Sequence, residues 1–137
     1  MPDTPGHIVF RLAAGVITAA AFLVIGIVGG DGFTPSNGLE FVEWFLGPGA
    51  IACLAGWRRD PVAARLIYLG GIVGATAVAW AAGAVGVEPG ADPAMRSSYH
   101  LMLILIAAGI AAVVGLAAVV AGFWLGRRLA WWRHNPT

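Results

Sequence analysis

Four long apolar stretches constrain the fold of this 137-residue sequence more than any other feature. They cover about residues 8–30, 39–57, 62–87 and 101–126. A helix needs about 20 apolar residues to cross roughly 30 Å of hydrocarbon, and each stretch approaches or exceeds that length. The segments between them are rich in Gly, Pro, Asp and Asn, which is typical of loops. The sequence therefore predicts an all-α integral membrane protein, a bundle of four transmembrane helices.

The composition agrees with this prediction. The chain is 59% hydrophobic and 11% charged, with a mean hydropathy of +0.83, whereas a soluble domain carries about 25% charged residues. Too few polar side chains remain to cover a water-facing surface, so we expect residues 1–137 to form a single membrane domain. The net charge of +1 argues against nucleic-acid binding, which requires a basic stripe. Cys53 stands alone and is interpreted as a small buried hydrophobe.

Charged residues divide between the two sides of the predicted bundle. If the N-terminus is cytoplasmic, the inside segments hold seven of the eight basic residues: Arg11, Arg58, Arg59, Arg65, Arg127, Arg128 and Arg133. The outside loops hold Arg96 and most of the acids: Asp31, Glu40, Glu43, Glu88 and Asp92. Because arginine resists translocation, this asymmetry predicts an N-in/C-in topology in a bacterial inner (cytoplasmic) membrane. The first stretch lacks a preceding basic region and an Ala-x-Ala site, so we expect a retained span rather than a signal peptide.

Small residues recur at four-residue spacing along the predicted spans. Such residues lie on one helix face and let two backbones approach closely. The glycines expected to pack helices in this way are Gly26, Gly30, Gly70, Gly74, Gly115, Gly122 and Gly126. They exceed what one bundle needs, which favours contacts with copies of the chain or with a larger complex. A general abundance of Gly and Ala is the alternative explanation.

Residues 127–137 form an aromatic and basic cytoplasmic tail. Arg127, Arg128, Trp131 and Trp132 are expected to anchor it at an anionic membrane surface. We therefore expect bound lipids. Docking of the tail to a partner protein is the alternative.

The second span contains Pro48, which cannot donate a hydrogen bond to the Trp44 carbonyl, so a kink is predicted there. At the outer end of this span, Asn37 and Glu40 have the spacing of a capping box, which gives Glu40 a structural role. Glu43 lies one turn deeper. If neighbouring helices cover it, its pKa would rise and proton or cation handling becomes possible.

Metal and cofactor ligands are few and scattered. His7 and His134 belong to the inner side and His100 to the outer start of the fourth span, so a bis-histidine haem is not expected. We expect Ser97 and Ser98 to cap that span and His100 to lie at the interface, with a ligand or cofactor contact as the alternative for His100. No metal site, cofactor or catalytic constellation is predicted.

Two functions are compatible with these features. The first is a small non-catalytic integral membrane subunit that packs into and stabilises a larger respiratory, photosynthetic or transport complex. The alternative is a small homo-oligomeric transporter or channel that uses Glu43 near the outer end of the helix kinked at Pro48. The expected partners are the lipid bilayer and other integral subunits or copies of the chain, and we do not expect an enzyme.

Overall fold

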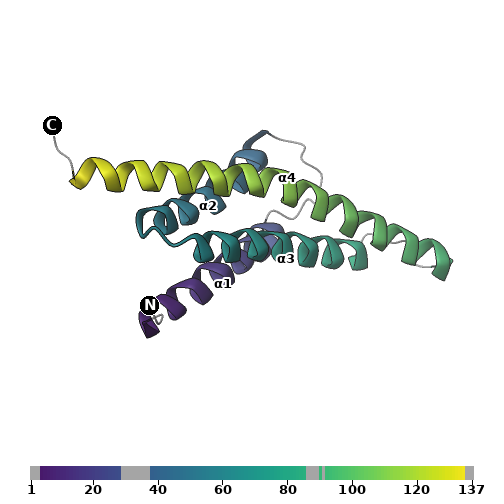
Figure 1. Cartoon of the computed structure of the whole chain (residues 1–137). Coiled ribbons are helices and arrows are strands. Elements are labelled where there is room, and N and C mark those ends of the chain that lie inside the picture. The colour runs from purple at the N-terminus through teal and green to yellow at the C-terminus, as the bar shows by residue number, and fades with distance from the viewer. Residues whose placement is uncertain (1–3, 29–37, 86–89, 91, 135–137) are drawn as a thin grey trace.

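The computed structural model describes residues 4–28, 38–85, 90 and 92–134, with side-chain surroundings for 4–24, 45–81, 90 and 92–133. The described residues form four α-helices and no strand (Figure 1), which confirms the all-helical prediction. The helices are α1 (Pro5–Val28), α2 (Gly38–Trp57), α3 (Pro61–Val85) and α4 (Pro93–His134).

Three of these helices are long and apolar enough to cross a membrane. The qualifying segments are Pro5–Val24 of α1, Pro61–Ala81 of α3 and Pro93–Arg133 of α4. The described apolar segment of α2, Phe45–Trp57, is shorter, although α2 remains helical through Pro48. By length and composition the chain is a helical membrane protein, and the role of α2 as a fourth span stays a prediction.

The start of α4 differs from the sequence-based prediction. We expected Ser97 and Ser98 to cap it, and that is wrong: their hydroxyls donate to the carbonyls of Pro93 and Ala94 inside the helix. The Asp92 carboxylate is the cap, because its Oδ1 accepts a hydrogen bond from the Ala94 N–H at 3.2 Å. Proline is favoured at the first helical position, where its missing N–H costs nothing. The helix therefore begins eight residues before the predicted span.

The end of α4 also lies beyond the predicted span, because the helix continues through the tail to His134. Its 42 residues correspond to a length of about 63 Å, roughly twice the hydrocarbon thickness of a bilayer. The predicted boundaries 101–126 marked where the hydrophobic stretch ends. They did not mark where the helix ends, since Arg, Leu and Ala are good helix formers.

The closest helix pairs are α1 with α3 and α2 with α4, while α3 also packs against α4. Figure 1 shows α3 between α1 and α4, with α2 alongside α4, and it places the start of α1 and the end of α4 at the same end of the bundle. Gly15 faces Leu66, and Ala19 faces Gly74 further along both helices. The α1/α3 pair is therefore parallel.

Glycines bring the backbones of α1 and α3 into contact. A Cβ atom added at Gly70 would meet the Gly15 carbonyl oxygen, and one at Gly74 would lie 2.9 Å from the Ala19 carbonyl oxygen. The same relation holds between α2 and α4, where Gly122 lies against the carbonyl oxygen of Gly49 and Gly126 against that of Cys53, so this pair is parallel too. Both parallel pairs thus pack backbone against backbone.

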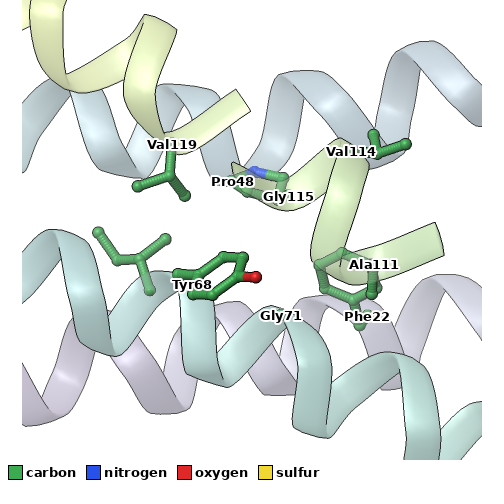
Figure 2. A pocket seen from close by; sticks show the side chains of 9 residues that line it. Phe22, Pro48, Tyr68, Gly71, Ala111, Val114, Gly115 and Val119 are labelled. Atoms are coloured by element: carbon green, nitrogen blue, oxygen red, sulfur yellow. The ribbon is translucent and has the colours of Figure 1, made fainter. Parts of the chain in front are cut away.

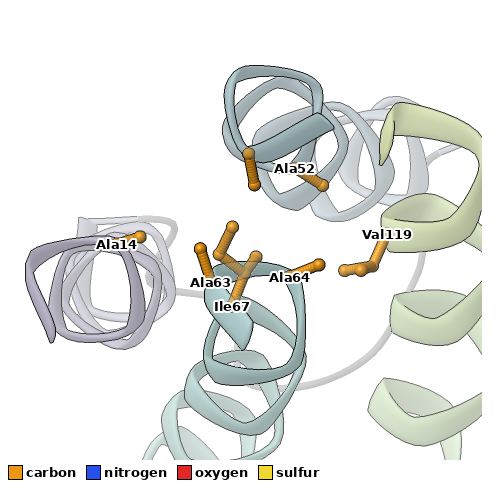
Figure 3. Close-up of a cluster of buried hydrophobic side chains, with 7 residues drawn as sticks. Ala14, Ala52, Ala63, Ala64, Ile67 and Val119 are labelled. Carbon is orange, nitrogen blue, oxygen red and sulfur yellow. The ribbon is translucent and has the colours of Figure 1, made fainter. Parts of the chain in front are cut away.

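The core between the helices is built from small side chains (Figure 3). Its centre is Ile67 of α3, which is fully buried. Around it pack Ala14, Ala52, Ala55, Ala63, Ala64 and Val119, which come from all four helices. Alanine predominates because helices in close backbone contact leave little room for side chains. Thr18 is buried as well, and its hydroxyl donates to the Ala14 carbonyl at 2.7 Å.

Substitution of Gly122 with Ala tests the α2/α4 contact. The added Cβ would meet the Gly49 carbonyl, so we expect the free energy of unfolding to fall by about 1–3 kcal/mol. Gly109, on the same helix, has nothing within 4 Å of its Cβ position. The control variant, Gly109→Ala, should therefore raise the free energy of unfolding by about 0.5–1 kcal/mol. Denaturant titration in micelles, followed by tryptophan fluorescence, measures the unfolding free energy of both variants. Equal changes in the two variants would contradict the assigned packing.

Candidate functional site at the arginine-rich end of the bundle

The turn between α2 and α3 is a Schellman motif. The Asp60 N–H donates to the Ala55 carbonyl at 2.9 Å, and the Arg59 N–H donates to the Gly56 carbonyl at 3.0 Å. Arg59 has a φ of 55°, a left-handed conformation at the position where helices usually place glycine. This reversal closes α2 and places Asp60 directly at the start of α3.

Asp60 joins the start of α1 to the start of α3. Its Oδ1 accepts hydrogen bonds from the N–H groups of Val62 at 3.0 Å and Ala63 at 3.1 Å, which caps α3. Its Oδ2 accepts a hydrogen bond from Arg11 Nε of α1 at 2.8 Å, and His7 Nδ1 lies 3.7 Å from the same oxygen. Only 2% of Asp60 is exposed and 19% of the Arg11 side chain, so the ion pair is largely buried.

The environment of Asp60 stabilises its ionised form. Burial alone raises the pKa of this carboxyl, but the Arg11 hydrogen bond and charge, together with the two backbone N–H groups, outweigh it. The net result is a pKa below the ordinary value of 3.8. The Asp60 carboxylate is therefore charged at neutral pH and neutralises Arg11.

The Arg11–Asp60 pair was not predicted from the sequence, where Arg11 was assigned only to the basic residues of the inner side. A signal was present, because Asp60 is an acid among arginines and stands directly before Pro61, an N-cap pattern. The sequence could not indicate that α1 lies beside this turn.

Arginines also stack on aromatic rings at this end. The Arg58 guanidinium lies 4.2 Å from the centre of the Phe10 ring, which links the α2–α3 turn to α1. Arg133 of α4 lies 5.7 Å from the Trp57 ring centre. These cation–π contacts and the Asp60 pair connect the ends of all four helices at one end of the bundle.

A surface hollow of about 620 Å³ lies on α4 at the same end. We call it the tail hollow; it is lined by Trp124, Arg127, Arg128, Trp131 and Trp132. The structure thus brings together the four residues expected to anchor the tail and adds Trp124. The Arg128 guanidinium lies 4.4 Å from the centre of the Trp124 ring.

Other predicted site residues lie elsewhere. Glu40 and Glu43 belong to the first turns of α2, and their side chains lie outside the described part of the chain. His100 lies on α4, 27 residues and about 40 Å before Arg127. It is half-buried, and its Nε2 atom is buried and has no hydrogen-bond partner among the described residues.

The predicted packing glycines occupy several different environments. Gly70 and Gly74 contact α1, while Gly122 and Gly126 contact α2, where Gly126 lies against the Cys53 carbonyl. A Cβ at Gly115 would lie 3.7 Å from the Tyr68 ring, an ordinary contact. Gly30 and the surroundings of Gly26 lie outside the described residues.

A small cavity lies beside Pro48 at the centre of the bundle (Figure 2). Its volume is about 10 Å³, which is at the lower limit for one water molecule. Tyr68 extends into this region from α3, and its hydroxyl donates to the Ala112 carbonyl of α4 at 3.2 Å. Among the described residues, no three His, Cys, Asp or Glu side chains gather closely enough to hold a metal ion.

The arrangement defines a class: a helical membrane protein with one arginine-rich, aromatic end. No protein-family model, curated protein or solved structure matches this chain.

Substitution of Asp60 with Asn tests the buried pair. The amide oxygen can still cap α3, but the charge that neutralises Arg11 is lost, so we expect the free energy of unfolding to fall by about 2 kcal/mol. Asp92 is an exposed cap of α4 and provides the control, since Asp92→Asn should change stability by less than about 0.5 kcal/mol. Equal losses in the two variants, measured by denaturant titration, would show that Asp60 acts as a cap alone.

The contribution of this pair should depend on pH. Because the pKa of Asp60 is lower in the folded chain than its ordinary value, the stabilisation is complete above that ordinary value. It declines as the pH falls through the folded-state pKa. The difference in unfolding free energy between the wild type and Asp60→Asn should shrink as the pH falls below about 4. A difference that increases as the pH falls below about 4 would refute this assignment.

Proposed function

We propose that this chain is a small non-catalytic integral membrane subunit that packs into and stabilises a larger membrane complex of respiratory, photosynthetic or transport type. The main support is the first part of α4. From Pro93 to Ile106 no residue is buried, and the first buried residue of this helix is Ala107. These 14 residues extend over about 21 Å.

The side chains exposed on this part of α4 are large and apolar. They are Met95, Tyr99, Leu101, Met102, Leu105 and Ile106. An exposed apolar helix face of this length offers a packing surface to another membrane helix. The outer face of α1 offers a second surface, with Val9 and Val16 each about two-thirds exposed.

In the proposed arrangement all four helices cross a bacterial inner membrane and both termini are cytoplasmic. The contacts of Asp60 with Arg11 and of Arg133 with Trp57 support a common side for the start of α1, the α2–α3 turn and the end of α4. The arginines concentrated there would occupy the cytoplasmic side by the positive-inside rule.

The alternative is a homo-oligomeric transporter or channel that uses Glu43. The cavity beside Pro48 has room for one water molecule at most, so a transport path would have to lie between copies of the chain. No described contact favours this alternative over the subunit.

Extraction in a mild detergent followed by native mass spectrometry tests the proposal. We expect the chain to be recovered with other membrane polypeptides. Replacement of Leu101 and Leu105 with Ala should reduce their recovery at least about fivefold, because each truncation removes apolar contact area. The control replaces Val113 and Val120 with Ala. Both residues are exposed on α4 beyond the proposed surface, so this variant should recover the other polypeptides about as well as the wild type. Recovery of the wild type as a homodimer or homotetramer alone would refute the subunit proposal.

A further inference from the structure

We propose that the tail hollow binds the phosphate group of an anionic phospholipid. This inference rests on the membrane placement of α4 but not on assembly into a larger complex. The hollow combines three indole rings with two guanidinium groups on one helix surface. Its three tryptophan residues, Trp124, Trp131 and Trp132, are each more than half exposed.

Charge favours an anion in the hollow. No described carboxylate forms a salt bridge with Arg127 or Arg128. Asp60 is the described carboxylate at this end of the bundle, and its two oxygens are already engaged by Arg11 and by the N–H groups that start α3. Two guanidinium groups therefore remain to be neutralised from outside the described chain.

The stacking of Arg128 on Trp124 orients it for phosphate recognition. The guanidinium carbon lies over the ring, 4.4 Å from its centre, and this contact restricts the position of the guanidinium group. The guanidinium group carries five N–H donors in one planar fork. A fixed planar fork of donors suits two phosphate oxygens at once.

The position of the hollow favours a lipid over a dissolved anion. Gly126 lies against the backbone of Trp57, where α2 ends. From Gly126 to Trp132 the helix rises about 9 Å, comparable to a headgroup layer of about 5–8 Å per leaflet. Indole rings prefer this layer, because their apolar body and N–H donor suit its mixed polarity. The walls of the hollow would then contact glycerol and upper acyl carbons while its arginines bind the phosphate.

The test uses the purified full-length chain in neutral micelles, titrated with short-chain phosphatidylglycerol and followed by native mass spectrometry and tryptophan fluorescence. We expect Arg127→Gln with Arg128→Gln to weaken binding about tenfold. The matched control, Arg59→Gln with Arg65→Gln, removes the same charge from exposed arginines at the same end and should weaken binding less than about twofold. Circular dichroism verifies that both variants remain helical.

Three results would overturn the inference. Equal weakening in the two double variants would indicate general attraction to a basic surface. Equal affinity for phosphatidylcholine would show that the net negative charge of the lipid is not recognised. Displacement of the lipid by an equal concentration of glycerol phosphate would indicate a site for free anions. Because the chain is tested without partner polypeptides, none of these results depends on the proposed complex.

Discussion

Direct contact between helix backbones is the constraint on which the rest of the structure depends. Inside a membrane, apolar side chains gain little by leaving lipid for protein, so association relies on close packing. Here glycines supply it in two parallel pairs, with Gly70 against Gly15 and Gly122 against Gly49. The small core follows directly, since Ile67 is its largest fully buried side chain. Most of the described large apolar residues are left on the outside, where they face the surrounding lipid or another helix.

Asp60 joins two helices near their ends, where backbone N–H groups and charged side chains need hydrogen-bond partners. One carboxylate oxygen satisfies two N–H groups that start α3, and the other holds Arg11 of α1. A single side chain thus fixes the end of a turn, the start of a helix and the position of a neighbouring helix. It leaves no described carboxylate to pair with Arg127 and Arg128, and we propose that an external anion neutralises these arginines of the tail hollow.

Much of the fold could be predicted from hydrophobic length and loop composition, because both act locally along the chain. The starts of α1, α2 and α3 lie within three residues of the predicted boundaries. The start of α4 was misplaced because Asp92 and Pro93, a strong start signal, precede the hydrophobic stretch that was used to position it. The Arg11–Asp60 pair could not be predicted, since 49 positions separate its members and only the packing of α1 on α3 brings them together. Glu43, selected from the sequence as a site for ion handling, remains a hypothesis.

The pairing of alternate helices has a consequence for biosynthesis. In an ordinary helical hairpin the second helix packs on the first soon after it leaves the ribosome. Here the partner of α1 is complete only after α2 and most of α3 have been made, because Gly74 contributes to their contact. The partner of α2 is α4, the last helix to be translated. The small-residue faces of α1 and α2 are therefore without their partner helices during most of synthesis and contact lipid or the insertion machinery instead. The bundle can form completely only near the end of translation.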